Sequence, residues 1–270
     1  MEIPDGFRSE EEFNFPNIVT VCVLRGFCTA KCIHCPVGRA DIPERLEKFG
    51  NKSMEPGLFK KIIDEMSRFK HSTLRVHSVG EPTLWKELPE ALKYAKQKAI
   101  AVWIFTNAIT KNRELLKNLA DNCAIIEVSA NSFDKKNYLK TKRVDSFELV
   151  RENIEYLSGA IKKSNAKNLL LVSRVESRDK EYDRKFIEFW KKTGLVSYSL
   201  IRNYLNYTDI IADVNEKKAR KIAPCSAHWT RFDIDCDGKA IICFHELLRG
   251  RKPSEILVLG DVNKTSIKKI

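Results

Sequence analysis

Short apolar runs rich in β-branched residues alternate with amphipathic stretches over the first two hundred residues. NIVTVCVL at 17–24 predicts a buried strand. GLFKKIIDEMSRF (57–69) repeats apolar residues at helical spacing and predicts a helix that begins near Pro56. The same order recurs further along the chain. The strands are expected at 17–24, 73–79, 101–106, 124–130, 168–175 and 196–201. The helices are expected at 57–69, 84–98, 111–121, 146–161 and 181–192.

This alternation of six strands with helices indicates an α/β fold with parallel strands and right-handed helical crossovers. Two architectures satisfy the pattern, an open doubly wound sheet and a partial β/α barrel. Both place ligands at the carboxyl ends of the strands. Functional side chains are therefore expected on the loops that follow the strands.

The pattern changes after residue 201. A polar, irregular stretch, 202–224, precedes TRFDIDCDGKAIICF (230–244), which predicts two strands around an Asp237-Gly238 hairpin turn. We therefore place a boundary near residue 205. The expected parts are an N-terminal extension (1–16), a core (17–205), a linker (206–224) and a small β-containing module (225–270).

Composition and charge narrow the class of protein. The 270 residues are 43% hydrophobic and 31% charged, which suits a globular domain with a small appendage and argues against disorder. No run approaches the ~20 apolar residues of a membrane helix, and the acidic N-terminus does not resemble a signal peptide, so we expect a cytoplasmic protein. The net charge of +12 comes from lysines scattered along the predicted helices, which favours a solvated surface over nucleic-acid binding.

Three of the eight cysteines lie close together in GFCTAKCIHCPVGRA (26–40), on the loop after the first strand. In a reducing compartment such thiols are metal ligands more often than disulfides. Cys28, Cys32 and Cys35 do not complete a tetrahedral zinc site, and no histidine stands at finger-like spacing, although His34 is adjacent. A [4Fe–4S] cube fits better, because three cysteines leave one iron open to a substrate or cofactor.

This CxxxCxxC arrangement on the first loop of a repeating β/α chain resembles the signature of the radical S-adenosylmethionine (SAM) enzymes. The resemblance covers about residues 17–267 and implies a partial (β/α)6 TIM-like barrel. It also implies that the methionine amino and carboxylate groups of SAM bind the open iron. An electron from the cluster, supplied by a flavodoxin or ferredoxin type of donor, then cleaves SAM to a 5′-deoxyadenosyl radical that abstracts hydrogen from the substrate.

Motifs after later strands are similar to the family's SAM-binding segments. SVGEPTLW (78–85) resembles GGEP, FTNA (105–108) resembles TNG, and VSANSFD (128–134) resembles SxD. A carboxylate at a strand end can accept hydrogen bonds from an ammonium group, and a glycine beside it allows close approach. The resemblance implies His34 at the adenine, Gly80 and Glu81 at the methionine amino group, Thr106 and Asn107 at the pocket mouth, Ser129 and Asn131 at the ribose, and Arg174 at the SAM carboxylate.

Several of these residues have purely structural alternatives. Glu81 can begin a Glu-Pro turn, and residues 106–107 can form an ordinary polar turn after a strand. Arg174 can be an exposed strand-end arginine, and Lys142 or Arg143 can take its place at the SAM carboxylate.

The tail carries a second cysteine pattern. Cys225, Gly238 and Cys243 resemble the opening of the SPASM and twitch modules, which implies an auxiliary iron–sulfur cluster held by the two cysteines. No cysteine follows residue 243, so Cys236, His228 or His245 completes the site, or the cluster is lost, or the module continues beyond this sequence. We expect the last of these.

The function expected from these residues is that of a radical SAM enzyme, an oxidoreductase that acts on a small polar metabolite such as a sugar or aminocyclitol. The alternative within the family is a SPASM-type enzyme that matures a peptide. The alternative from another class is a non-catalytic zinc or nucleic-acid-binding protein that uses the same thiols structurally.

Overall fold

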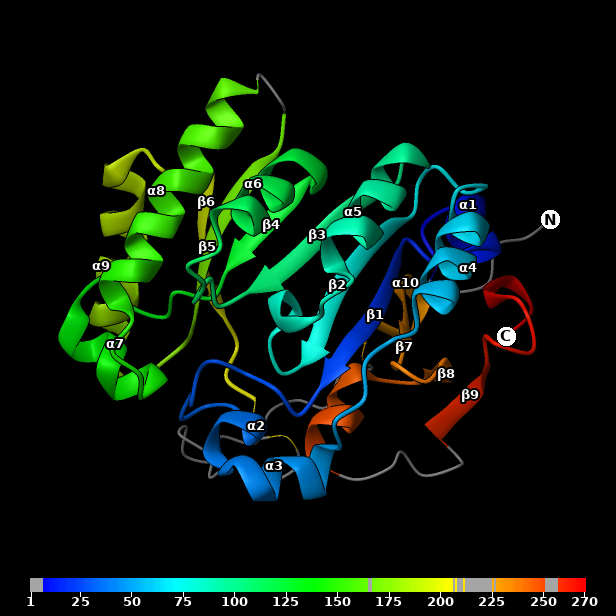
Figure 1. Ribbon diagram of the computed structural model, residues 1–270, viewed down its shortest axis with the longest axis horizontal. Helices are drawn as coiled ribbons and strands as arrows, with labels where there is room; N and C mark the ends of the chain where they lie inside the picture. Colours follow the sequence, from blue (N-terminus) through cyan, green and yellow to red (C-terminus); the bar gives the residue numbers. More distant parts are fainter. Residues whose placement is uncertain are drawn as a thin grey trace.

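The computed structural model of the chain describes residues 7–164, 167–205, 207, 211, 225, 227–250 and 257–270 (Figure 1). Nine strands of this described part form one sheet, in the order β6-β5-β4-β3-β2-β1-β7-β8-β9. The strands are β1 (Ile18–Arg25), β2 (Thr73–Val79), β3 (Ala101–Thr106), β4 (Ile125–Val128), β5 (Leu169–Val175), β6 (Tyr198–Arg202), β7 (Arg231–Ile234), β8 (Lys239–Ile241) and β9 (Val258–Asp261).

The first six strands are parallel, and each lies beside its neighbour in sequence. A doubly wound sheet reverses its strand order at a switch point, whereas a β/α barrel adds its strands in sequence. The order therefore selects the partial barrel from the two architectures that the sequence left open, and it confirms the predicted α/β fold class.

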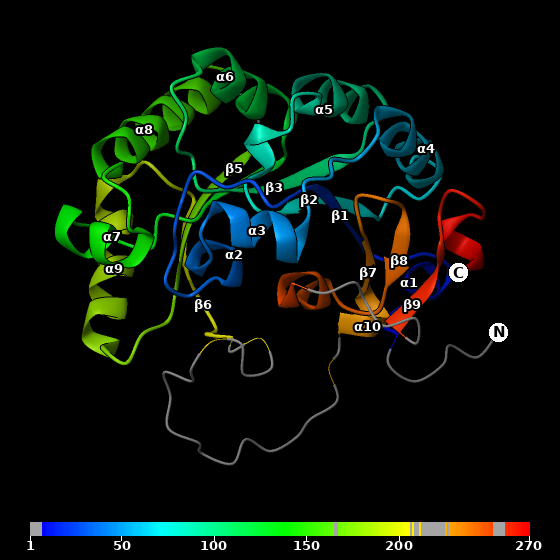
Figure 2. The ribbon, with the colours of Figure 1, turned by 60° about the horizontal axis from the view of Figure 1, so that its bottom comes forward.

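Helices follow the strands as the periodicity predicted. The α-helices are α1 (Glu10–Asn14), α2 (Pro36–Arg39), α3 (Ile42–Phe49), α4 (Pro56–Met66), α5 (Leu88–Gln97), α6 (Arg113–Asn122), α7 (Lys135–Lys142), α8 (Phe147–Lys163), α9 (Lys180–Thr193) and α10 (Ala227–Thr230). Short 3-10 helices are η1 (Pro82–Leu84), η2 (Phe244–Arg249) and η4 (Ile267–Lys269). Helices α4, α5, α6 and α8 form an arc over one face of the sheet (Figure 2). We call the opposite face the inner face.

The core lies between this arc and the sheet. The apolar positions of α4 that recur at helical spacing, among them Ile62, Ile63 and Met66, are fully buried. The helix expected at 84–98 begins only at Leu88, because residues 82–84 form a separate 3-10 turn and Pro89 suits only the first turn of a helix.

The C-terminal strands extend the same sheet. β7 pairs in parallel with β1 on the side away from β2, and β8 and β9 follow antiparallel. The predicted hairpin at Asp237-Gly238 is confirmed, with Gly238 at a φ of +88° and its N–H donating to the carbonyl of Asp235 over 2.9 Å. Most of the expected linker lies outside the described residues. The division near residue 205 stays a prediction.

No helix among the described residues has both the length and the apolar character that a bilayer crossing requires.

Candidate metal centre and cofactor site

The cysteine loop leaves β1 directly against the end of β2. The N–H of Gly26 donates to the carbonyl of Val79 over 2.8 Å, and the N–H of Glu81 donates to the carbonyl of Phe27 over 2.8 Å. Gly80 has a φ of +153°, and a Cβ at this position would come within 2.0 Å of the Phe27 oxygen. Only glycine fits, so this residue joins the SVGEP segment to the cysteine loop.

A buried arginine holds the loop from the other side. Arg45 of α3 is 4% exposed, and its guanidinium donates to the carbonyls of Ala40 over 2.9 Å, Cys28 over 3.2 Å and Ala30 over 3.5 Å. These carbonyls belong to an irregular segment that lacks helix or strand partners of its own. Arg45 therefore satisfies backbone groups that burial would otherwise leave unpaired.

The three cysteines of the loop are half-buried. Burial is the main cause that raises the pKa of Cys28 to about 12 and that of Cys35 to about 11. The thiols of Cys28 and Cys35 are thus protonated without a metal, and iron binding would release their protons. In α2, Gly38 lies so close to the loop that a Cβ would come within 2.4 Å of the Cys32 nitrogen.

The chemistry of these donors fits a cluster. Within the described ranges, no three His, Cys, Asp or Glu side chains surround a point where a single metal ion could bind. A [4Fe–4S] cube takes one thiolate on each of three irons, so its ligands need not converge on one ion. Three thiols on one loop, held by backbone contacts from several elements, suit that arrangement.

Glu81 lies at the carboxyl ends of β2 and β3 and is 2% exposed. Its Oε1 accepts from the hydroxyls of Thr106 over 2.6 Å and Thr83 over 2.8 Å, and its Oε2 accepts from the N–H of Asn107 over 2.7 Å. Burial raises the pKa of this carboxyl, and the hydrogen bonds oppose that rise. The structure thus brings Glu81, Thr106 and Asn107 together, as the motifs suggested. Their contact with SAM stays a prediction.

Asn107 also connects β3 to the cysteine loop. Its Nδ2 donates to the Thr29 hydroxyl over 2.9 Å and lies 3.7 Å from the Cys28 sulfur. Its Oδ1 accepts from the N–H of Ile109 over 2.8 Å. The polar turn that the sequence offered as an alternative is present, and the same side chain faces the loop.

Ser129 and Asn131 form a bridge between β4 and β5. Asn131 has a φ of +59°, a conformation that asparagine tolerates better than most residues. Its Oδ1 accepts from the N–H of Val175 over 2.9 Å, and its Nδ2 donates to the Ser129 hydroxyl over 2.8 Å. These internal bonds explain why an amide stands where the family motif has an acid.

His34 lies in a cationic environment. Burial, with the positive charges of Lys142 and Arg174, lowers the pKa of His34 to about 3, so the ring is neutral at pH 7. Lys142 is 1% exposed and donates to the Ser129 hydroxyl over 3.3 Å. The structure therefore groups His34 with both lysine and arginine candidates for the SAM carboxylate.

Arg174 is buried and not an exposed strand-end residue. Its Nε lies 3.2 Å from the Asp183 Oδ1, and its guanidinium lies 4.5 Å from the centre of the Tyr182 ring. Its Nη1 is buried without a hydrogen-bond partner among the described residues. One donor of a fixed guanidinium is therefore available to a ligand.

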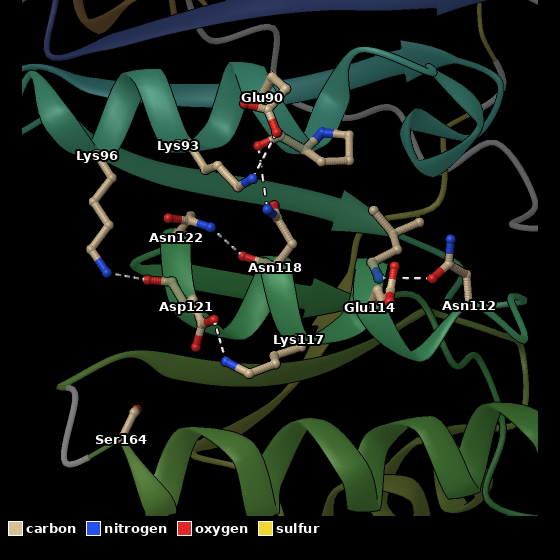
Figure 3. Close-up of a pocket in the computed structure, with 12 residues that line it drawn as sticks. Glu90, Lys93, Lys96, Asn112, Glu114, Lys117, Asn118, Asp121, Asn122 and Ser164 are labelled. Atoms are coloured by element: carbon tan, nitrogen blue, oxygen red, sulfur yellow. Dashed lines mark hydrogen bonds and ion pairs between the residues drawn. The ribbon is translucent and has the colours of Figure 1, made fainter.

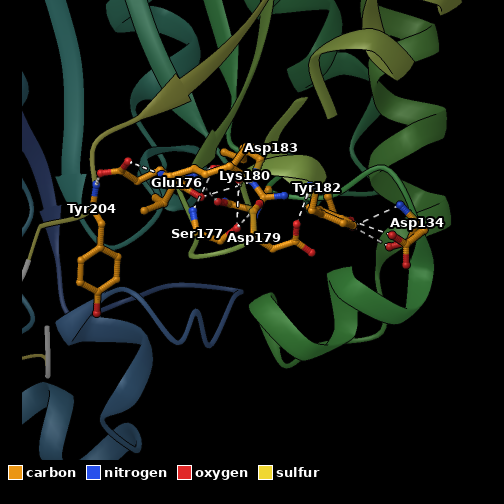
Figure 4. A network of polar contacts seen from close by, with 12 residues as sticks. Asp134, Glu176, Ser177, Asp179, Lys180, Tyr182, Asp183 and Tyr204 are labelled. Atoms are coloured by element: carbon orange, nitrogen blue, oxygen red, sulfur yellow. Dashed lines mark hydrogen bonds and ion pairs between the residues drawn. The ribbon is translucent and has the colours of Figure 1, made fainter. Parts of the chain in front are cut away.

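A polar network surrounds the start of α9 (Figure 4), and it includes Asp183, the ion-pair partner of Arg174. Tyr182 donates from its hydroxyl to the Asp134 carboxylate over 2.7 Å, and the Ser177 hydroxyl donates to the Asp183 carboxylate over 3.0 Å. The network joins the N-termini of α7 and α9 to the end of β5.

Tyr138 of α7 is a residue that the motifs did not reveal. Its hydroxyl is buried and has no hydrogen-bond partner within the described part of the chain. Burial, together with the charges of Cys32, Cys28 and Glu81, raises its pKa. The hydroxyl thus belongs to the same site, and an unpartnered buried donor there fits a bound group. In the sequence, the one feature that pointed to Tyr138 was its position in NYLKTKR, the segment that also contains Lys142.

The second cysteine pair is only partly defined. Cys225 is exposed, and Cys243 is half-buried directly before η2, near enough that a charge on Cys225 contributes to its raised pKa. Cys236 is buried beside Asp235, and burial raises its pKa to about 12. The side chain of His228 lies outside the described part. The auxiliary cluster stays a prediction.

A hollow of about 750 Å³ lies elsewhere, in the outer layer formed by α5 and α6 (Figure 3). Its charged side chains pair with one another, as Lys93 does with Glu90 at 2.7 Å and Lys117 with Asp121 at 2.6 Å. None of the residues that the motifs single out lines it. We assign it no part in the site.

Comparison with known families places the chain in a family. A model described as the Radical SAM superfamily matches residues 23–187, which include the end of β1, the cysteine loop and strands β2 to β5.

Curated relatives match shorter segments. The Fe-coproporphyrin III synthase of Methanosarcina barkeri is 38% identical over 95 residues, which are 35% of this chain and 22% of that protein. The PqqA peptide cyclase of Bradyrhizobium diazoefficiens is 31% identical over 112 residues, 41% of this chain and 27% of that protein. The matches thus span about a quarter of each relative's length.

Among solved structures, Streptococcus suis SuiB bound to S-adenosylmethionine superposes with a TM-score of 0.73 at 13% identity, covering 95% of this chain and 65% of SuiB. SuiB has also been solved bound to the precursor peptide SuiA. At this identity the likeness shows the fold alone.

Proposed function

The chain belongs to the radical SAM superfamily, and we propose that the substrate on which it acts is a peptide. The cofactors of this enzyme family are a [4Fe–4S] cluster and SAM. When bound, they supply an electron and a radical able to abstract hydrogen from the substrate. We assign the cluster to Cys28, Cys32 and Cys35.

The residues around the loop would orient SAM. Glu81 offers a buried carboxylate to an ammonium group, while Arg174 and Lys142 offer cations to a carboxylate. The neutral ring of His34 suits contact with an adenine. The hydrogen bonds that already fix Glu81 and Arg174 mean that little side-chain freedom is lost when SAM binds.

The match to the PqqA peptide cyclase carries the substrate proposal. It exceeds 30% identity over a segment of more than one hundred residues, and the enzyme is named for a peptide. The fold shared with SuiB, which binds a precursor peptide, agrees with it. The sequence favoured a sugar or aminocyclitol, so the comparisons support its alternative better.

The class of chemistry is tested on protein reconstituted with iron and sulfide without oxygen. After reduction by dithionite or by a flavodoxin system, the chain should cleave SAM to 5′-deoxyadenosine. Cys32→Ala should abolish this activity and lower the bound iron. Cys123→Ala, in the buried core at the end of α6, is the matched control and should retain both. Bound zinc in place of iron would contradict the assignment.

The substrate class is tested with defined pools of short peptides and of aminocyclitols. Peptides should increase the rate of 5′-deoxyadenosine formation and change mass by loss of hydrogen or formation of a new bond. If only the aminocyclitol pool responds, the peptide proposal is wrong.

A further inference from the structure

Three residues side by side on β1, β2 and β3 each carry a buried hydrogen-bond donor without a partner. Thr20 is the register partner of Arg75, and Arg75 is the register partner of Trp103. The Thr20 Oγ1, the Arg75 Nε and the Trp103 Nε1 are buried and have no hydrogen-bond partner in the part of the chain that the structure describes. Native proteins leave few such groups unpaired, so three in one row call for an explanation.

The row lies on the inner face of the sheet. Leu74 and Val76 are fully buried in the core beneath the helices, and side chains alternate along a strand, so Arg75 points to the opposite face. Arg75 and Trp103 are only half-buried, so part of each side chain is accessible, although the three unpartnered donor atoms themselves are buried. From Arg75 to Gly80 at the strand end the backbone covers roughly 16 Å.

The row contains an uncompensated cation. Two other arginines face the same region, and each has its own carboxylate: the Arg202 Nε lies 3.0 Å from the Glu127 Oε1, and the Arg231 Nε lies 2.9 Å from the Asp233 Oδ1. Among the described residues no carboxylate forms an ion pair with Arg75. Three guanidinium groups therefore face two carboxylates, which leaves an excess of one positive charge.

Aromatic rings fix the position of this guanidinium. The Arg75 Cζ lies 4.4 Å from the centre of the Phe105 ring and 5.4 Å from that of Trp103. Burial, with the charges of Arg231 and Arg202, lowers the pKa of Arg75 to about 10, so it stays cationic at pH 7. A bound anion would offset this repulsion and complete the hydrogen bonding of the row.

We propose that Thr20, Arg75 and Trp103 bind a carboxylate of the substrate. Arg and Trp only donate hydrogen bonds, so the ligand must accept them. An excess of one charge suits a monoanion such as a carboxylate better than a phosphate. The inference rests on the proposed function: the carboxylate is that of an acidic side chain or of a C-terminus in a peptide. The distance from the strand ends makes the row an anchor for a part of the substrate remote from the reacting carbon.

The test measures binding to the reconstituted enzyme with SAM. The probes are N-acetylglutamate α-amide and its glutamine counterpart, which differ only in charge. The wild type should bind the acidic probe about tenfold more tightly, and Arg75→Gln should remove that preference. Arg184→Gln, an exposed arginine on α9 paired with Glu181, loses the same charge and should keep the preference.

Two results would overturn the proposal: equal affinity of the wild type for both probes together with no Arg75-dependent binding of N-acetylalanine, or an unchanged preference in Arg75→Gln. Should Arg75→Gln fail to fold, Trp103→Phe removes one donor of the row and keeps an aromatic ring. It should weaken binding of the acidic probe and leave that of the glutamine probe unchanged, and equal effects on the two would contradict the proposal.

Further probes separate the source of the carboxylate from the peptide proposal. Arg75-dependent binding of N-acetylalanine, without binding of the glutamate probe, would assign the row to a C-terminus. If glutarate binds in an Arg75-dependent way but no peptide is modified, the carboxylate site stands and the peptide function fails. If the wild type and Arg75→Gln both modify peptides with and without acidic groups equally well, the peptide function stands and the carboxylate site fails.

Discussion

Replacing Gly38 by alanine should separate the cysteine loop from α2 and thereby weaken cluster binding. The added Cβ would lie 2.4 Å from the nitrogen and 2.6 Å from the oxygen of Cys32, where ordinary contact begins at 3.4 Å. Both atoms are backbone, so no side-chain rotation relieves the overlap, and the loop or the helix must move by about 1 Å. Such overpacking costs ~1–3 kcal/mol of unfolding free energy.

The displacement matters more for the metal than for the fold. Metal–ligand distances hold within about 0.2 Å, so a shift of Cys32 by several times that value disturbs the ligand set. It also reaches Cys35, whose N–H lies 3.3 Å from the Cys32 carbonyl. We expect Gly38→Ala to lose most of its iron.

The assay is iron and sulfide per chain after anaerobic reconstitution, with urea unfolding of the metal-free protein alongside. Gly159→Ala is the matched control, because it also adds a methyl group to a helical glycine and no atom lies within 4 Å of the new Cβ. It should keep its iron and gain up to ~1 kcal/mol of stability. If Gly38→Ala equals this control in both iron content and stability, the proposed contact does not hold the loop.

Three further substitutions test other parts of the structure. Arg45→Met removes three hydrogen bonds to loop carbonyls and should lower the unfolding free energy, measured by urea unfolding, by ~2–4 kcal/mol. The control Arg39→Met, on the exposed side of α2, should change this free energy little. Asn131→Ala should lower the unfolding free energy by ~1–3 kcal/mol. Asn131→Gly should lower it less, because glycine adopts the positive φ of this position without strain, and equal losses in the two variants would argue against backbone strain. The hydrogen bond from Lys239 is the main cause that lowers the pKa of Asp261 from 3.8 to about 2. The ionised carboxylate therefore stabilises the fold above its ordinary pKa, and this stabilisation is lost as the pH falls toward 2. The Asp261→Asn variant should therefore lose less stability than the wild type between about pH 4 and pH 2, measured as the midpoint of urea unfolding. If the two midpoints fall in parallel as the pH is lowered, the reasoning is refuted.

The periodicity of the sequence was enough to predict the α/β class, and the cysteine spacing with its place after the first strand was enough to predict the family. Strand order was not accessible in the same way, because it depends on which distant segments pair. The turn at Asp237-Gly238 was predictable because its signal is local.

The residues that support the site were harder to find. Arg45 lies in an amphipathic helix, where an arginine usually indicates a solvated face, and its burial depends on carbonyls of another segment. Tyr138 has no motif of its own. The row at Thr20, Arg75 and Trp103 exists only through the register of three strands, which the sequence pattern does not specify.

The pairing of β1 with β7 has a consequence for the order in which this chain acquires its structure. β1 carries the cysteine loop, yet the strand along its second side begins at Arg231, and the partly buried ion pair of Arg25 with Asp235 spans 210 positions. During synthesis β1 therefore has an unpaired edge until residues 231–234 have left the ribosome. The cysteine loop is accordingly made long before the strand that completes its scaffold, so the loop reaches its final surroundings late in folding.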